Sequence, residues 1–281
     1  MRWLSPCKLN LWLRVYERSD ELHPLESLVV LVDWNDELSV EEATEDKFEI
    51  SGPLSEGVPD DESNLVWRAL ELARSTAGIE ERFDVQLTKH IPTGAGLGGG
   101  SSDAATMLQA FDRLTDRTSA SELAPSLGSD IPLFLGRGVQ HVLDTGEIIN
   151  QADSVGEFAV AIAVPPVHLS TPRVYVMWDQ MGGPTEPAIS GRQIPPSLRG
   201  VELFNDLYPA AVAIAPELGD WRADLARRWG CPVFMSGSGS ALFSYFSDVE
   251  EAQAAADSAP SGVRASMGAE LSVDGAYVRS D

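Results

Sequence analysis

The most informative stretch of this chain is Pro92-Thr93-Gly94-Ala95-Gly96-Leu97-Gly98-Gly99-Gly100-Ser101-Ser102. Five of the seven residues from 94 to 100 are glycine, which allows the backbone to adopt positive φ angles and to approach a ligand closely. Alternating apolar residues predict a strand before the stretch, over 83–89, and an apolar face at positions 104, 107, 108 and 111 predicts a helix after it. The N-terminus of that helix would direct free N–H groups and its positive dipole end at the loop. We therefore predict a phosphate-binding loop that works mainly through backbone donors.

Three other interpretations of the glycine stretch fit the sequence less well: a flexible linker, a P-loop and a dinucleotide-binding loop. A flexible linker would not join directly to a well-patterned helix. A P-loop needs Lys followed by Ser or Thr after its last glycine, whereas Ser101-Ser102-Asp103 follows here. The spacing Gly94-x-Gly96-x-x-Gly99 matches the dinucleotide-binding fingerprint, but that fingerprint needs an acid at the end of a second strand about 20 residues on. Asp112 and Asp116 fall within or just after the predicted helix instead.

Composition limits the possible partners of the protein. The net charge is −23, and the only lysines among 20 basic residues are Lys8, Lys47 and Lys89. A surface this acidic repels nucleic acid and anionic membranes. No apolar run reaches the length of about 18 residues that a membrane span needs, the N-terminus lacks the apolar core of a signal peptide, and the two cysteines make no metal or redox spacing. We expect a cytoplasmic protein that binds a small molecule, with a monomer and a homodimer both open.

The N-terminal residues predict a strand that carries chemistry. From Lys8 to Tyr16, leucines and valines alternate with polar residues, so Lys8, Asn10, Trp12 and Arg14 are expected on one face. A second strand is expected to end near Asp33, with a turn over 33–37 and short strands after it.

The remaining pattern predicts two mixed domains. Ser63 is expected to cap a helix, residues 182–196 to form a surface loop, and residues 233–245 to form two strands around a glycine turn. Because the hydrophobic pattern weakens over 146–156, we expect domains at 1–153 and 154–281. Strands and helices that do not alternate regularly favour an α+β fold over a doubly wound sheet.

Four segments together resemble the GHMP kinases, and within them the kinases of 4-diphosphocytidyl-2-C-methyl-D-erythritol. They are Lys8-Leu9-Asn10-Leu11, the glycine stretch, Leu127-Gly128-Ser129-Asp130-Ile131-Pro132, and Met235-Ser236-Gly237-Ser238-Gly239-Ser240-Ala241. They occur in the order found in that family and span nearly the whole chain. The resemblance implies two α+β domains with the active site in the cleft between them. It also implies transfer of the γ-phosphoryl group of ATP to the 2-hydroxyl of the methylerythritol unit.

The resemblance further implies roles for individual residues. Lys8 and Asp130 are expected to be the catalytic pair: Asp130 takes the alcohol proton, and Lys8 keeps Asp130 ionised. A helix cap for Asp130 and a solvated surface position for Lys8 stay open as alternatives. Residues 92–102 are expected to hold the ATP phosphates, and Asn64 and Lys89 to line the adenine pocket. Mg²⁺ is expected with ATP, and Ser102 and Asp130 are the nearest candidate ligands.

The expected substrate site uses residues from both halves of the chain: Asn10, His23, Thr171, Pro172, Tyr175, Gly237, Ser238 and Gly239. The glycine turn could close on the substrate phosphates or be a plain hairpin turn. The family usually has Asp-Gly-Tyr-His where this chain has Asp20-Glu21-Leu22-His23. His23 can hydrogen-bond a base edge, whereas Leu22 cannot stack as an aromatic ring does; Tyr175 is expected to be the second aromatic wall. A GHMP kinase for another alcohol, such as homoserine or a sugar, and a non-catalytic nucleotide-binding protein of this fold are the alternatives.

Overall fold

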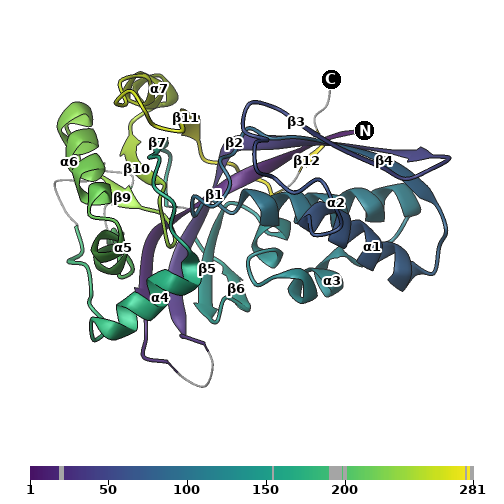
Figure 1. Ribbon diagram of the computed structural model, residues 1–281, viewed down its shortest axis with the longest axis horizontal. Coiled ribbons are helices and arrows are strands. Elements are labelled where there is room, and N and C mark those ends of the chain that lie inside the picture. The colour runs from purple at the N-terminus through teal and green to yellow at the C-terminus, as the bar shows by residue number, and fades with distance from the viewer. Residues whose placement is uncertain (19–21, 154, 190–197, 199–200, 276, 279–281) are drawn as a thin grey trace.

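The structure is a computed structural model that describes residues 1–18, 22–153, 155–189, 198, 201–275 and 277–278. Two β-sheets lie side by side, each with its own helices (Figure 1). Mixed strands and helices of this kind confirm the predicted α+β class. Residues 20, 21, 154 and 190–197 lie outside the described part of the chain, so part of the loop expected over 182–196 and the exact boundary at 153/154 are not described.

The larger sheet is built on two long antiparallel strands, β1 (Arg2–Val15) and β2 (Leu25–Ala43). β2 also pairs with β4 (Arg82–Thr88), and β4 pairs in parallel with β3 (Lys47–Ser51). At its other end β2 pairs with β5 (Val139–Asp144), which continues to β6 (Ile148–Gln151). Two short strands from the second half, β8 (Phe204–Asn205) and β12 (Tyr277–Val278), pair with β1. The second half of the chain therefore contributes strands to the first sheet.

Two register shifts between β1 and β2 correct the sequence predictions. Asn10 pairs with Val29 and Trp12 with Leu28, so Leu11 is an extra residue that bulges from β1. Because side chains alternate with period two, one extra residue moves every later side chain to the other face. Lys8 and Asn10 therefore face one cavity together with Leu13, and the prediction that Trp12 and Arg14 share their face is wrong: these two line a separate cavity.

The second shift replaces the turn predicted over 33–37. Pro6 pairs with Asn35 and Cys7 with Val32, so residues 33–34 bulge while β2 runs on unbroken to Ala43. A bulge keeps both strands paired on either side of the extra residues. The polar residues over 33–37, which predicted a turn, therefore lie within the single strand β2.

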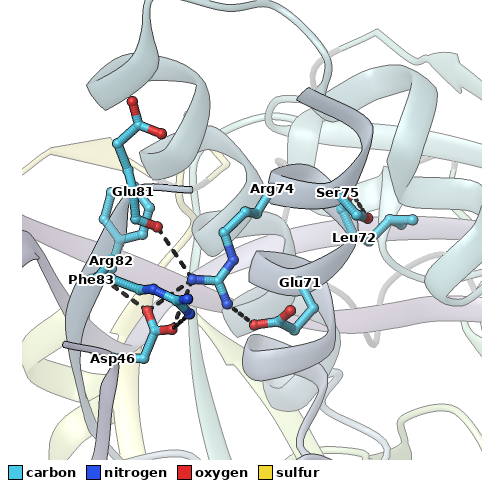
Figure 2. A network of polar contacts seen from close by, with 8 residues as sticks. All are labelled: Asp46, Glu71, Leu72, Arg74, Ser75, Glu81, Arg82 and Phe83. Atoms are coloured by element: carbon cyan, nitrogen blue, oxygen red, sulfur yellow. Dashed lines mark hydrogen bonds and ion pairs between the residues drawn. The ribbon is translucent and has the colours of Figure 1, made fainter. Parts of the chain in front are cut away.

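Helices α1 (Leu65–Ala77), α2 (Gly99–Thr115) and α3 (Ala120–Leu127) cover one face of the larger sheet together with the 3₁₀ turn η1 (Pro132–Leu135) (Figure 1). Asn64, rather than the predicted Ser63, caps α1 by accepting a hydrogen bond from the N–H of Val66 over 2.9 Å. The other end of α1 is held by Arg74, whose guanidinium donates to both carboxylate oxygens of Asp46 at 2.9 and 2.8 Å (Figure 2). Asp46 also accepts from Arg82 and from the N–H of Phe83, so this network attaches the helix to β4.

The smaller sheet has the order β11 (Ala265–Glu270), β7 (Ala159–Val164), β10 (Leu242–Phe246) and β9 (Phe234–Met235). Its helices are α4 (Thr171–Gln180), α5 (Tyr208–Ile214), α6 (Glu217–Trp229) and α7 (Val249–Asp257). The predicted strand, glycine turn and strand over 233–245 are confirmed as β9 and β10. No helix in the described residues is long and apolar enough to cross a membrane.

The two sheets share an apolar seam. Leu9 and Leu11 of β1 pack in one buried cluster with Leu97 of the glycine stretch and with Ile162 and Phe243 of the smaller sheet. The same strand thus contributes to the sheet core and to the contact between the sheets. This seam fixes β1 and the glycine stretch relative to the second half of the chain.

Candidate active site

A cavity of about 630 Å³ lies where the two halves of the chain meet. Its walls come from β1, β2, the glycine stretch, the segment before η1, the turn between β5 and β6, α4, and the turn between β9 and β10. Among its lining residues are these predicted site residues: Lys8, Asn10, His23, Gly96, Gly98, Asp130, Thr171, Pro172, Tyr175, Gly237 and Ser238.

The floor of the cavity is formed by Lys8 and Asn10. Both side chains are buried, with 7% of each residue exposed. The Lys8 ammonium donates to Oδ1 of Asn10 over 2.5 Å, and the Asn10 amide donates to the hydroxyl of Ser27 over 2.8 Å. Burial lowers the pKa of Lys8, an effect opposed by the negative charge of Asp130. The buried position excludes the solvated surface lysine as an interpretation of Lys8.

Asp130 approaches the same space from the helices that cover the larger sheet. It lies between α3 and η1, is exposed, and lines the cavity. Residue 131, not Asp130, is the residue that precedes η1, and it makes no side-chain cap bond. The helix-cap alternative for Asp130 is therefore wrong, and its carboxylate is available to a ligand in the cavity.

The glycine stretch needs its glycines for close backbone packing. Gly96 and Gly98 have φ angles of +78° and +72°, a region that side chains of L-residues rarely adopt. A Cβ at Gly96 would lie 2.4 Å from the carbonyl oxygen of Ser236, and one at Gly98 would lie 2.7 Å from Cζ of Phe134. The loop backbone is also bound to β1, since the N–H of Lys8 donates to the carbonyl of Leu97 over 2.9 Å.

Helix α2 begins at Gly99, directly after the left-handed Gly98, which has no side chain to cap it. Its first N–H groups are therefore available to a ligand. The hydroxyl of Ser102 in the first turn is buried and has no hydrogen-bond partner in the described part of the chain. A buried polar atom without a partner is costly, so this oxygen is a good candidate to meet a bound group.

The turn between β9 and β10 closes over Lys8. A Cβ at Gly237, which has a φ of +56°, would lie 3.2 Å from the Lys8 ammonium nitrogen and 3.3 Å from the carbonyl oxygen of Gly96. The Ser236 hydroxyl donates to the same Gly96 carbonyl over 3.0 Å. Asn205, which no sequence motif singled out, donates its amide hydrogens to the carbonyls of Met235 and Gly237, both at 2.8 Å. These contacts exceed what a plain hairpin turn would need.

The remaining predicted substrate residues lie on α4 and the loop after β1. The hydroxyl of Thr171 lies 2.7 Å from that of Ser238, which joins the start of α4 to the glycine turn. The ring of His23 stacks on Tyr175 with a centroid distance of 5.4 Å and an angle of 26°. Burial, and then the charge of Asp130, raise the pKa of Tyr175 to about 12. Gly239 is the exception, because a Cβ there would meet Leu169 and Met235 at 2.9 Å instead of the cavity.

Lys89 requires a correction. The prediction that its side chain lines a nucleotide pocket does not agree with the structure, because Lys89 is only 1% exposed. Its ammonium forms ion pairs with Asp36 of β2 and, at 2.6 Å, with Asp103 of α2. Asp36 also accepts hydrogen bonds from the N–H groups of His90 and Ile91. Lys89 therefore holds the glycine stretch to the sheet and helix beneath it.

The other predicted nucleotide residues lie outside the cavity wall. Asn64 uses both ends of its amide within the protein, because it caps α1 and also donates to the carbonyl of Pro59 over 2.7 Å. Thr93 and Gly94 line a smaller hollow of about 430 Å³ beside His168 and Arg264. Nucleotide contacts from these residues stay predictions, as do those from Pro92, Ala95, Leu97, Gly99, Gly100 and Ser101.

Comparison with known proteins identifies the family of this chain. The family described as GHMP kinases N terminal domain matches residues 64–138. The 4-diphosphocytidyl-2-C-methyl-D-erythritol kinase of Protochlamydia amoebophila is 36% identical over 250 residues, which cover 86% of this chain and 83% of the relative. The kinase of the same name from Cereibacter sphaeroides is 38% identical over 258 residues, covering 89% and 91%.

Solved structures of kinases share the fold of this chain. A crystal structure of 4-(cytidine 5'-diphospho)-2C-methyl-D-erythritol kinase superimposes with a TM-score of 0.79 at 31% identity, covering 97% of this chain and 99% of that one. A homoserine kinase from Cytophaga hutchinsonii has a TM-score of 0.67 at 17% identity, covering 99% and 97%. At 17% identity, the similarity to the homoserine kinase shows a shared fold only.

Proposed function

This chain belongs to the 4-diphosphocytidyl-2-C-methyl-D-erythritol kinases within the GHMP kinases, and we propose that its phosphoryl transfer takes place in the cavity above Lys8. The protein is an ATP-dependent small-molecule kinase of isoprenoid precursor biosynthesis. Its reaction phosphorylates 4-diphosphocytidyl-2-C-methyl-D-erythritol, and we place the new phosphate on the 2-hydroxyl of the methylerythritol unit.

One observation carries the assignment of the site. Lys8 is in contact with two distant segments: its backbone N–H donates to the carbonyl of Leu97 in the glycine stretch, and Gly237 lies beside its ammonium, which also donates to Asn10 on the same strand. A cation buried at the meeting point of two glycine turns can attract a phosphoryl group as its charge develops. Such preorganised charge in a dry site is usually the largest contribution to catalysis.

Asp130 is proposed as the group that takes the proton. In phosphoryl transfer the acceptor hydroxyl must be aligned and must lose its proton as it attacks. Asp130 is the exposed carboxylate of the cavity whose charge acts directly on Lys8. A carboxylate in this position can act as a general base toward the attacking hydroxyl.

The glycine stretch and the start of α2 are proposed to bind the ATP phosphates. A Cβ at Gly98 would collide with Phe134 and come within 3.2 Å of Cγ of Lys8, so the loop lies directly against the floor of the cavity. Backbone donors are well suited to this chain, because a net charge of −23 leaves few cations for phosphate binding.

Mg²⁺ is proposed as the companion of ATP. It binds hard oxygen ligands, keeps several waters, and usually takes only one or two protein groups beside the phosphates. The hydroxyl of Ser102, which has no partner among the described residues, and the exposed carboxylate of Asp130 are oxygen donors of that type. Bound there, Mg²⁺ would neutralise charge on the phosphates.

We further propose that the protein works in the cytoplasm on its small-molecule substrates. Cys7 and Cys231 are both free, which agrees with a reducing compartment. The strongly acidic composition argues against binding to nucleic acid or to anionic membranes.

The proposed reaction is tested by the structure of its product. The purified protein is incubated with ATP, Mg²⁺ and 4-diphosphocytidyl-2-C-methyl-D-erythritol, and the product is followed by ³¹P NMR. We expect a new phosphomonoester signal coupled to the carbon that bears the 2-hydroxyl, with the diphosphate signals retained. A phosphate on another hydroxyl, or release of inorganic phosphate only, would contradict the proposal.

A further inference from the structure

Asp179 stands beside the aromatic residues of the cavity and was not singled out by its sequence. It lies in the last turn of α4 and lines the cavity, with 41% of its side chain exposed. Its Oδ2 lies 3.2 Å from Nε2 of His23. Tyr175 lies four residues before Asp179 in the same helix, and residues at this spacing share one helix face.

His23 has no ring nitrogen left for a ligand in this arrangement. Nδ1 lies 3.1 Å from the carbonyl oxygen of Tyr16, and Nε2 is bonded to Asp179. The ring is packed between Tyr175 and Trp178, and only 8% of the side chain is exposed. The expected hydrogen bond from His23 to a base edge therefore lacks a free ring atom here.

The carboxylate of Asp179, unlike the ring of His23, has an atom that remains available to a ligand. Its other oxygen, Oδ1, makes no side-chain hydrogen bond to any described residue, and the group is accessible from the cavity. A carboxylate only accepts hydrogen bonds. Cytosine carries an exocyclic amine at N4, to which Asp and Glu are suitable acceptors, whereas uracil carries an oxygen at that position.

We infer that Asp179 is a specificity-determining residue that accepts a hydrogen bond from the cytosine amine, while His23 holds its carboxylate in place. The inference rests on the proposed function, because it takes the cytidine substrate as given. The stacked rings of His23 and Tyr175 provide an aromatic wall beside this acceptor. A uracil base would direct its O4 oxygen at the carboxylate, and two acceptors that face each other repel.

Other carboxylates of the cavity suit this role less well. Asp130 acts on Lys8, where the alcohol is expected to react. Glu147 lies in the turn between β5 and β6 and has no aromatic ring on its own element. Glu147 is therefore the matched control, since its replacement removes one negative charge from the same cavity.

The experiment compares kcat/KM for the cytidine substrate with kcat/KM for its uridine counterpart. The wild type is expected to prefer cytidine. Asp179→Asn keeps the size of the side chain but can donate to uracil O4, so we expect the preference to fall by roughly tenfold or more, the effect of about 1.4 kcal/mol. The KM for ATP should not change. Asp179→Glu, which keeps the acceptor, should retain part of the preference.

The control separates base recognition from charge. Glu147→Gln reduces repulsion of both substrates equally, so the cytidine-to-uridine ratio should stay as in the wild type. An Asp179→Asn enzyme whose ratio remains within twofold of the wild type would overturn the inference, as would a wild type that shows no preference. Failure of the wild type to phosphorylate either substrate would instead overturn the proposed function. Circular dichroism and melting curves of each variant identify any loss of folding. If Asp179→Asn does not fold, the cytidine-to-uridine ratio of Asp179→Glu is compared with that of the wild type, and an unchanged ratio would overturn the inference.

Discussion

The ammonium of Lys8 lies 2.5 Å from Oδ1 of Asn10, and both residues are more than nine-tenths buried on one face of β1. The bulge at Leu11 follows this pair, and it turns Leu13 toward the cavity and Trp12 away from it. A fixed and buried cation of this kind is the centre of the proposed site. The predictions below test the groups around it.

Replacing Asp130 with Asn should remove the proposed proton acceptor. We expect turnover to fall by roughly 10²–10⁴-fold, the usual range for a positioned acid–base group, while ATP still binds. Steady-state kinetics and ATP titration of the variant provide the measurement. Asp220→Asn, on the exposed side of α6, is the control and should act as the wild type. Near-normal turnover of Asp130→Asn would remove this residue from the mechanism.

Replacing Gly98 with Ala should weaken ATP binding. The new Cβ would lie 2.7 Å from Cζ of Phe134, in addition to the strain of a φ of +72°. Gly78→Ala controls for that strain, because Gly78 has a φ of +64° but nothing within 4 Å of an added Cβ. A left-handed alanine costs about 1–2 kcal/mol, so both variants should melt earlier. Only Gly98→Ala should also raise the KM for ATP; equal kinetics in the two variants would place the phosphates elsewhere.

The buried cluster beneath the glycine stretch predicts a pH dependence. Burial, opposed by the charge of Lys89 and increased by that of Asp36, raises the pKa of Asp103 from 3.8 to about 7. A carboxyl whose pKa is higher in the folded protein stabilises it fully below the unfolded pKa and loses that contribution as pH rises through the folded pKa.

Asp103→Asn removes this titration and keeps the shape of the side chain. The melting temperature of the wild type minus that of the variant should therefore decrease between about pH 4 and pH 7, and stay level above pH 8. Melting curves across this range provide the measurement. A difference that is constant with pH would show that Asp103 is ionised throughout.

The acidity of the chain predicts a salt dependence. With a net charge of −23, folding brings many like charges close together. Their repulsion weakens as the Debye length falls from about 30 Å at 0.01 M salt to about 3 Å at 1 M. We expect the melting temperature to rise, and the KM for ATP not to increase, as KCl increases at fixed Mg²⁺. A level or falling melting temperature together with a rising KM would show that the acidity is incidental to stability and to ATP binding.

Local features of the fold were predictable from the sequence. The glycine stretch could be recognised because glycine is the residue that readily adopts a positive φ, and Gly96 and Gly98 both do so. The strands around Gly237 and the helix after Gly98 likewise follow from short patterns. Most of the predicted substrate residues therefore meet in one cavity.

Features that depend on distant partners were not predictable. Apolar and polar residues alternate along β1 without interruption, so the sequence of β1 does not reveal the bulge at Leu11. The bulge is seen only in the pairing of β1 with β2. Lys89 was expected to line the adenine pocket because its buried partner Asp36 lies 53 residues away in the sequence. The proposed role of Asp179 likewise depends on its contact with His23, which is 156 residues away in the sequence.

The most direct test of the central claim is the rate of ADP release by the purified protein in a coupled assay with ATP and Mg²⁺. The cytidine substrate is compared with homoserine, a sugar and mevalonate at equal concentrations. We predict that kcat/KM for 4-diphosphocytidyl-2-C-methyl-D-erythritol exceeds that for every other alcohol, and that Lys8→Ala abolishes the rate. A higher kcat/KM for another alcohol, or a Lys8→Ala enzyme as active as the wild type, would contradict the account.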